Sequence, residues 1–244
     1  MKIAVAGKGG SGKTTTCAVL ARTLARSGQT TLALDCDSNP NLGISLGIGE
    51  DATEHLISVR DAVDAGDEEH ALTADDLVER FGVDAPDGVR LAVVSAIQNP
   101  EPGCPCCGIS PEQLLGQLAR PGRVVVADFE AGLGTVMRLD ANPIDVVLVV
   151  VEPTAKSLEA GRRVAESVQK TGVGRVVVAA NRMRDDEDGA RVRTAFPGLE
   201  VVPVPDDPAI MDAERRGVAP LDAAPNAPGV RALVDLADQL LSRR

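Results

Sequence analysis

The sequence lacks a long hydrophobic run, and this absence bears on where the protein resides. Its most apolar run, Val146–Val151, is far shorter than the roughly 20 residues that a bilayer-spanning helix needs, and Asp145 and Glu152 flank it. The amino-terminal residues do not have the composition of a secretory signal peptide. We therefore expect a cytoplasmic protein that has no stable association with a membrane.

Positive charge is also scarce. The 244 residues include 25 Lys and Arg against 36 Asp and Glu, which gives a formal net charge of −11. Basic residues form pairs rather than tracts, at Arg162-Arg163, Arg215-Arg216 and Arg243-Arg244. Non-specific binding to nucleic acid depends on a Lys/Arg patch that neutralises phosphates. We therefore expect no nucleic-acid partner.

Histidine is nearly absent, whereas the few cysteines are clustered. His55 and His70 lie far from any cysteine in the sequence, which argues against a mixed Cys/His zinc finger. Three of the five cysteines, Cys104, Cys106 and Cys107, lie in the segment GCPCCGIS. Thiols stay reduced in the cytosol, so closely spaced cysteines there indicate metal binding or redox chemistry rather than a structural disulfide.

Short β-branched runs alternate with helical patterns along the chain. The expected strands are Lys2–Ala6, Thr31–Asp35, Arg90–Ser95, Val124–Asp128, Val146–Val151, Arg175–Ala180 and Glu200–Val204. The clearest helical patterns are Lys13–Ser27, Leu158–Thr171 and Val230–Ser242. Strands that are apolar throughout are typical of parallel sheets covered on both faces. We predict one α/β domain over residues 1–244, a doubly wound, mostly parallel sheet with helices on both faces, and short surface helices over Glu50–Asp87.

The segment AVAGKGGSGKTTT after the first expected strand matches the phosphate-binding pattern G-x-x-x-x-G-K-[ST]. In such a loop, glycines let backbone N–H groups surround phosphate oxygens. Lys13 supplies a positive charge to the β- and γ-phosphates, and the Thr14 hydroxyl binds Mg²⁺. The residues expected to bind phosphate are Gly9, Gly10, Ser11, Gly12, Lys13, Thr14 and Thr15.

A second lysine, Lys8, directly follows Gly7. This pattern resembles the deviant Walker A P-loop ATPases, which include partitioning and cell-division-site ATPases, the nitrogenase iron protein and nickel-insertion ATPases. The resemblance implies a P-loop NTPase fold, ATP and Mg²⁺ as cofactors, and a homodimer that closes on ATP. It also implies that Lys8 reaches the phosphates bound by the partner subunit.

Acidic residues lie at the ends of two of the expected strands. Asp128 ends the run VVVAD and has the position of a Walker B acid that holds Mg²⁺ through water. Asp35 and Asp37 flank Cys36, so the two carboxylates share a side if the strand continues. The family resemblance implies that Asp37 orients or deprotonates the attacking water and that Asp35 lies near the Mg²⁺ shell.

Two later loops suggest a base pocket. A guanine-binding N-K-x-D motif would need Asp at position 184, where Arg184 stands, so GTP is disfavoured. Asn181 and Arg182 resemble the family's adenine-contacting Asn-Arg pair, and Pro205 and Asp207 resemble its second adenine loop. Turn formation alone would also account for Asn, Pro and Asp in these places.

Several blocks, in order, resemble the nickel-insertion ATPases that mature carbon monoxide dehydrogenase: DCDSNPNL, DFEAGLG, VVEPTAKSLEAGRRV and VPDDPAI. That branch also carries a G-C-x-C motif, which here contains Cys104 and Cys106. A C-x-C pair from each subunit would place four thiolates across the dimer axis, a set that suits Zn²⁺ or Ni²⁺. The resemblance implies a metallochaperone whose client is a metalloenzyme such as carbon monoxide dehydrogenase.

The chain departs from the pattern of this branch in two places, and two alternative functions stay open. The branch usually has Glu-His where Gly134-Thr135 stand here, and Cys107 extends the cysteine motif. One alternative is an Fe–S carrier or reductase in which cysteines of two subunits hold a cluster. The other is a positioning ATPase of the partitioning or division-site type, whose membrane form would need an amphipathic tail such as VRALVDLADQLLSRR.

Overall fold

The computed structural model describes residues 1–37, 39–65, 73–94, 115–118, 120–129 and 144–243, and of residues 58–65 it describes the backbone. The strands form one sheet in the order β3-β4-β2-β5-β1-β6-β7-β8. Their bounds are β1 Lys2–Gly7, β2 Thr30–Cys36, β3 Val83–Ala85, β4 Val89–Val93, β5 Arg123–Phe129, β6 Val146–Val151, β7 Arg175–Met183 and β8 Glu200–Pro205. Every neighbouring pair is parallel except β3 and β4.

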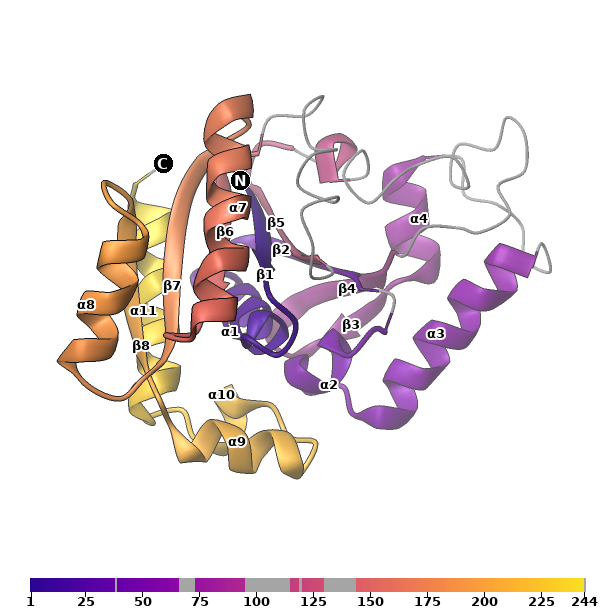
Figure 1. Ribbon diagram of the computed structural model, residues 1–244. Coiled ribbons are helices and arrows are strands. Elements are labelled where there is room, and N and C mark those ends of the chain that lie inside the picture. The colour runs from indigo at the N-terminus through magenta and orange to yellow at the C-terminus, as the bar shows by residue number, and fades with distance from the viewer. Residues whose placement is uncertain (38, 66–72, 95–114, 119, 130–143, 244) are drawn as a thin grey trace.

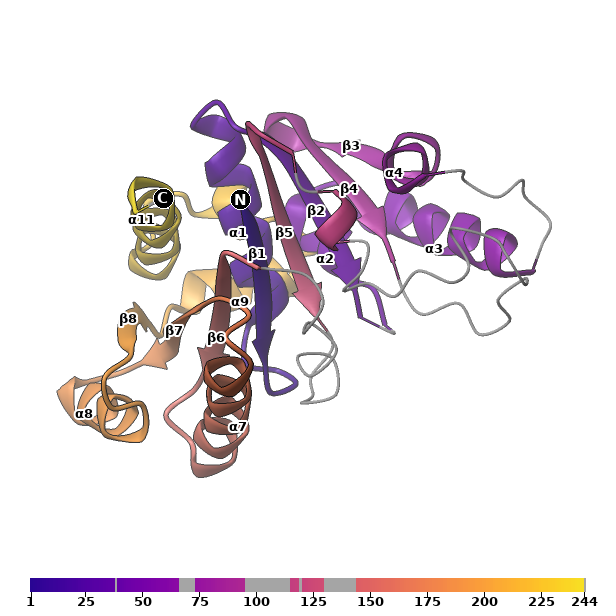
Figure 2. The same cartoon turned by 90° about the horizontal axis from the view of Figure 1, so that it is seen from above.

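Helices cover both faces of the sheet (Figure 1). Their bounds are α1 Lys13–Arg26, α2 Leu42–Leu46, α3 Glu50–Ala65, α4 Ala74–Phe81, α7 Ala155–Thr171, α8 Asp186–Ala195, α9 Pro208–Arg215, α10 Pro220–Ala223 and α11 Pro228–Ser242, with a 3₁₀ turn, η1, at Pro86–Gly88. Viewed from above, α1 and α11 lie on one side of the central strands and α7 on the other (Figure 2). Among the helices in the described ranges, none combines the length and the apolar character that crossing a membrane requires.

The core consists of two apolar layers, one on each face of the sheet. One layer joins strand residues such as Leu34 and Val149 to α4, α7 and α8. The other joins strand residues such as Val5 and Leu148 to α1, α2 and α11. The inner strands are buried along almost their whole length because both of their faces are covered. This arrangement confirms the predicted doubly wound α/β fold.

The crossing pattern of the chain places the carboxyl ends of β1, β2 and β5 at one edge of the sheet. Strand β1 is flanked by β5 and β6, and the chain passes from β5 to β6 across it. In open α/β sheets, ligands bind beyond the carboxyl ends of the strands where such a change of direction occurs. The loop after β1, which carries the predicted phosphate site, therefore lies at this position.

The segment between β2 and β4 differs from the prediction of short surface helices. Helix α3 has 16 residues, and residues Val83–Ala85 form an antiparallel edge strand that was not predicted. Three residues are too few to show the alternating pattern of a strand, and the pairing of β3 with β4 depends on the intervening turn at η1. Strand β4 also ends at Val93, before the predicted end at Ser95, which lies outside the described residues.

Candidate functional site

The loop after β1 needs glycine at two positions for steric reasons. Gly7 has φ 156°, and a Cβ atom there would lie 2.3 Å from the carbonyl oxygen of Val150 on β6. Gly12 has φ 94° and directly precedes α1, and a Cβ there would lie 2.3 Å from Nδ2 of Asn181. Both distances are shorter than any real contact of a Cβ atom. The two glycines thus fix the path of the loop against β6 and β7.

Residues at the start of α1 face the carboxyl end of β5. Lys13 is 6% exposed, and its charge favours the ionised form of Asp128. The Thr14 side chain makes a hydrogen bond with Asp128. The hydroxyl of Ser11 is buried and has no partner within the described structure. The helix N-terminus and Lys13 therefore provide positive potential where anionic oxygen atoms would enter.

Asp35 and Asp128 lie side by side at the ends of β2 and β5, where they are register partners. Burial raises the pKa of Asp35 to about 6, although the backbone N–H groups of Leu42 and Asp37 donate to its carboxylate. Burial raises the pKa of Asp128 to about 7, and the nearby Asp35 charge acts in the same direction. The site thus holds two carboxylates that lack a sufficient positive counterpart.

A magnesium ion would fit this arrangement. Oδ1 of Asp128 is buried and has no hydrogen-bond partner in the described structure, and the Thr14 hydroxyl is beside the same carboxylate. Mg²⁺ is usually held by one or two protein oxygens together with substrate phosphates and water. This explains why a site of this kind does not need three acidic side chains, and no such group of three occurs in the described residues.

Asp35 and Asp37 differ in what their carboxylates contact. Both Asp35 oxygens accept backbone N–H groups, from Asp37 at 3.2 Å and from Leu42 at 2.8 Å. Asp35 thereby ties the loop after β2 to the start of α2. Asp37 is only half-buried, and its Oδ1 accepts the N–H of Asn39 at 3.0 Å. Asp37 thus stabilises a turn in this state, and its action on a water molecule stays a prediction.

Lys8 is the exposed lysine of the phosphate loop. Its side chain is exposed, and its ammonium group contacts the carbonyl oxygen of Gly9 at 3.4 Å. Within the described residues it forms no ion pair of 4 Å or less. A lysine in this position is available to a group outside the subunit, which is what the predicted contact across a dimer requires.

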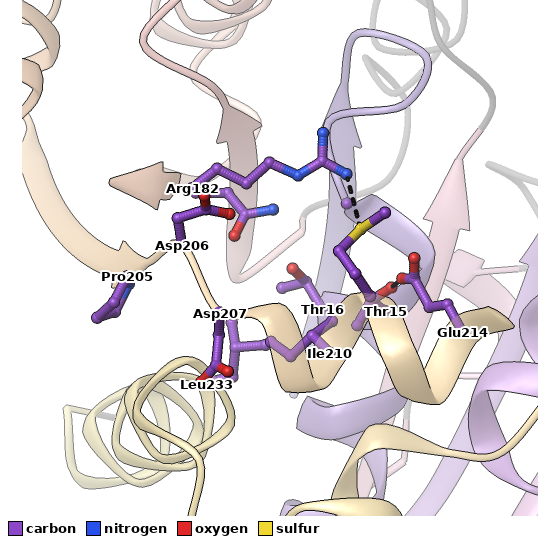
Figure 3. A pocket seen from close by; sticks show the side chains of 12 residues that line it. Thr15, Thr16, Arg182, Pro205, Asp206, Asp207, Ile210, Glu214 and Leu233 are labelled. Atoms are coloured by element: carbon purple, nitrogen blue, oxygen red, sulfur yellow. Dashed lines mark hydrogen bonds between the residues drawn. The ribbon is translucent and has the colours of Figure 1, made fainter. Parts of the chain in front are cut away.

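A pocket next to the phosphate loop brings together the two segments predicted to bind a base (Figure 3). It is lined by Gly12, Thr15, Thr16, Asn181, Arg182, Pro205, Asp206, Asp207, Ile210, Met211, Glu214 and Leu233. Its volume of about 20 Å³ accommodates about one water molecule. The pocket therefore has to widen before a nucleotide base can enter it.

Asn181 and Arg182 hold the β7 side of the pocket. Nδ2 of Asn181 donates to the carbonyl oxygen of Ser11 at 2.8 Å, which links the base side to the phosphate loop. Arg182 has φ 57°, an uncommon backbone conformation for a residue other than glycine. Its guanidinium forms an ion pair with Glu152 at the end of β6 and contacts the Met211 sulfur at 3.8 Å.

Asp207 uses both of its carboxylate oxygens within the protein. Oδ1 accepts the N–H of Ala209 at 3.0 Å and so caps α9, while Oδ2 accepts the N–H of Gly229 in the first turn of α11 at 2.8 Å. Asp207 therefore fixes the loop that forms one wall of the pocket, and Pro205 lies on the same wall. Direct contact of either residue with adenine stays a prediction.

Two acidic residues of the pocket region were not predicted from the sequence. Glu214 of α9 accepts a hydrogen bond from the Thr15 hydroxyl and so bridges α9 and α1. Glu152 belongs to the block that resembles nickel-insertion ATPases, but its pairing with Arg182 joins residues 30 positions apart. The position of Glu214, two turns into a helix that follows the Pro-x-Asp segment, was the one available signal.

The cysteines predicted to bind metal, Cys104 and Cys106, lie outside the described residues, as does Cys107. Of the other two, Cys17 is buried within α1 among core residues, and burial raises the pKa of its thiol well above the usual value. Cys36 is buried at the end of β2. Neither forms a disulfide.

Comparison with known proteins places the site in a family. Residues 2–221 match the model of the CobQ/CobB/MinD/ParA nucleotide binding domain. An uncharacterized ATP-binding protein of Methanocaldococcus jannaschii is 30% identical over 232 residues, covering 89% of this chain and 90% of the relative. The carbon monoxide dehydrogenase accessory protein CooC of Rhodospirillum rubrum is 26% identical over 244 residues, covering 92% of this chain and 91% of the relative.

Solved structures show the same fold. The cell-division ATPase MinD of Pyrococcus furiosus superposes with a TM-score of 0.67 at 22% identity, covering 100% of this chain and 99% of that structure. MinD of Pyrococcus horikoshii, solved with Mg-ADP, gives a TM-score of 0.71 at 20% identity, covering 98% and 96%. Together with the family match over residues 2–221, these findings show that the chain belongs to the CobQ/CobB/MinD/ParA family of nucleotide-binding P-loop proteins.

Proposed function

We propose that the protein hydrolyses ATP with Mg²⁺ and that it does so as a dimer. The observation that carries this proposal is the cluster at the carboxyl ends of β2 and β5. There Lys13, Thr14 and the unpartnered oxygen of Asp128 converge at the N-terminus of α1. Phosphoryl transfer depends mainly on positioning and charge neutralisation, and bound Mg²⁺ would neutralise phosphate charge at this cluster.

Each predicted catalytic residue has a distinct task in this proposal. Lys13 neutralises the phosphates of its own subunit from its buried position. Lys8 is exposed and reaches the phosphates of the partner subunit. Asp37 gives up its turn contact with Asn39 and orients the attacking water. A closed dimer would therefore be needed for full activity.

We further propose that ATP hydrolysis drives insertion of a metal, nickel in the first instance, into a client metalloenzyme such as carbon monoxide dehydrogenase. Support comes from the similarity to the accessory protein CooC along 92% of the chain. It also comes from the C-x-C motif at Cys104 and Cys106. Four thiolates from two subunits suit Ni²⁺ or Zn²⁺. Metal capture would be linked to ATP if both favour the closed dimer, since such coupling is reciprocal.

A steady-state ATPase assay tests the first part of the proposal. We expect Mg²⁺-dependent release of phosphate by the wild-type protein and loss of turnover in Asp37→Asn, which keeps the turn acceptor but removes the charge. Asp238→Asn, on the exposed side of α11, is the matched control and should retain full turnover. Equal activity of Asp37→Asn and wild type would contradict the assigned role.

The appearance and composition of the purified protein distinguish the Fe–S alternative from the proposed metal site. A cluster bridged by cysteines of two subunits would give a brown, oxygen-sensitive protein that contains iron and acid-labile sulfide, which a site holding Ni²⁺ or Zn²⁺ would not contain.

The positioning-ATPase alternative in its membrane form needs an available amphipathic tail. In the structure the apolar side of α11 is packed into the core through Val230, Leu233, Leu236, Ala237 and Leu240. This packing disfavours α11 as a membrane anchor.

A further inference from the structure

Arg182 is held in a costly conformation beside the pocket. Its φ of 57° lies in the left-handed region, which is unfavourable for a residue with a side chain and persists only where the surroundings enforce it. The distortion coincides with an irregularity in the pairing of β7 with β8, between Ala180 and Met183. It turns the Arg182 side chain away from the regular course of the strand and over the pocket (Figure 3).

Two contacts fix the guanidinium at its far end. Nη1 of Arg182 pairs with Oε1 of Glu152, and Nη2 lies 3.8 Å from the sulfur of Met211 on α9. Glu152 in turn follows β6, and its backbone N–H contacts the hydroxyl of the fully buried Ser157 at 3.0 Å. The Arg182 side chain therefore extends across the pocket from β7 to α9, and the ion pair with Glu152 holds its guanidinium from the side of β6.

The ion pair contributes little to the stability of the fold. The Arg182 and Glu152 side chains are 40% and 18% exposed, and ion pairs that solvent reaches contribute little to stability. The strained backbone lowers stability and a partly exposed ion pair offsets only part of that loss, so the two together do not stabilise the fold. Their common result is the placement of one planar cation next to the pocket.

We propose that Glu152 is a positioning residue of the nucleotide site, which orients Arg182 so that the flat face of its guanidinium covers the base. This inference rests on the proposed binding of ATP at the adjacent phosphate loop. Guanidinium groups stack on aromatic rings, and the interaction is strongest where water is excluded. Met211 of α9, which contacts the guanidinium, adds a polarizable side chain that adapts to the ring. Glu152 itself touches neither the base nor the phosphates.

The test measures separately how the base and the phosphates contribute to the binding affinity. Affinity for MgATP and for magnesium tripolyphosphate, which has no base, is measured by calorimetry for wild type, Glu152→Gln, Arg182→Ala and the double variant. We expect MgATP to bind about tenfold more weakly to each single variant and tripolyphosphate to bind as to wild type. The double variant should be no weaker than Arg182→Ala alone, because Glu152 acts through Arg182.

A matched control and a fold check accompany the variants. Glu159→Gln removes a carboxylate that pairs with Arg162 and Arg163 on the exposed side of α7, and it should leave both affinities unchanged. The melting temperature of the ligand-free protein should stay at the wild-type value for every variant. Equal MgATP affinity in Glu152→Gln and wild type would overturn the inference, as would equal weakening for tripolyphosphate. If the wild-type protein bound neither ligand, the proposed function itself would be wrong.

Discussion

At the scale of single residues, Asp128 is a buried carboxylate whose charged form is unfavourable. The residue is 1% exposed, one of its carboxylate oxygens has no partner in the described structure, and burial raises its pKa to about 7. A group whose pKa is higher in the folded protein binds protons more tightly there than in the unfolded chain. Folding stability is therefore lost as the pH rises from about 4 to about 7, and it stays reduced above that window.

Asp128→Asn should make the ligand-free protein more stable at pH 8, by on the order of 2 kcal/mol, and leave it nearly unchanged at pH 4. The neutral amide avoids the burial of a charge and can still accept a hydrogen bond from Thr14. Denaturant unfolding at several pH values measures the difference. The same variant should lose Mg²⁺-dependent turnover.

Asp238→Asn is the control for this prediction because its side chain is exposed on α11. Its stability relative to wild type should not change across the same pH range. If Asp128→Asn were less stable than wild type at pH 8, the buried carboxylate would be stabilising the fold, and the physical account of this site would be wrong.

Lys8 offers a second test at this scale. Because its side chain is exposed and contacts only its own loop within the described residues, Lys8→Ala should leave nucleotide binding by the monomer nearly intact. Turnover should fall by about 100-fold or more, as expected when a cation supplied to the partner's phosphates is lost. Lys156→Ala, an exposed lysine in the first turn of α7, serves as the control. A Lys8→Ala variant that keeps full turnover and still dimerises with ATP would contradict contact across the dimer.

At the scale of elements, close packing of α7 on the sheet depends on Gly161. A Cβ atom there would lie 2.4 Å from Cγ1 of Val151 and 3.1 Å from Cζ of Phe196. Gly161→Ala should therefore destabilise the protein by about 1–3 kcal/mol, since overpacking forces neighbours to move. For a chain of this size, each kcal/mol lowers the melting temperature by roughly 2–4 °C.

Gly189→Ala in α8 is the matched comparison. A Cβ there would meet only the end of the Arg193 side chain, at 3.2 Å, and that flexible group can move aside. Alanine also has the higher helix propensity, by about 1 kcal/mol. Gly189→Ala should thus leave stability unchanged or raise it, and equal destabilisation by the two substitutions would show that packing against β6 is not the cause.

Sequence reasoning was most successful where a pattern is local. The apolar runs located the inner strands, and the spacing of Gly7, Gly12 and Lys13 located the loop that the structure places at the switch point of the sheet. Contacts between distant segments carried no such pattern. Asp35 and Asp128 are neighbours because β2 and β5 are adjacent in the sheet. The ion pair between Glu152 and Arg182 depends on a distortion in β7. Strand β3 was missed because it is short and pairs across a tight turn.

At the scale of the whole molecule, an acidic chain is proposed to form a dimer through a loop that contains an exposed lysine. The formal net charge of −11 means that two subunits repel each other at long range. Nucleotide adds further negative charge, so closure needs local cations such as Lys8 and bound Mg²⁺. Salt screens the repulsion beyond about 10 Å at 0.1 M, and the proposed dimer should therefore form more readily at moderate than at very low ionic strength.

The central claim, that a dimeric ATPase carries metal between its subunits, is tested most directly by metal content. Elemental analysis of protein equilibrated with Ni²⁺ or Zn²⁺ is compared with and without ATP, for wild type and for Cys104→Ser/Cys106→Ser, with Cys17→Ser as the cysteine control. The account predicts about one ion for every two chains of wild type and of Cys17→Ser, retained better with ATP, and none in the double variant, although that variant still binds ATP. Unchanged metal content and unchanged ATP-dependent dimerisation in the double variant would contradict it.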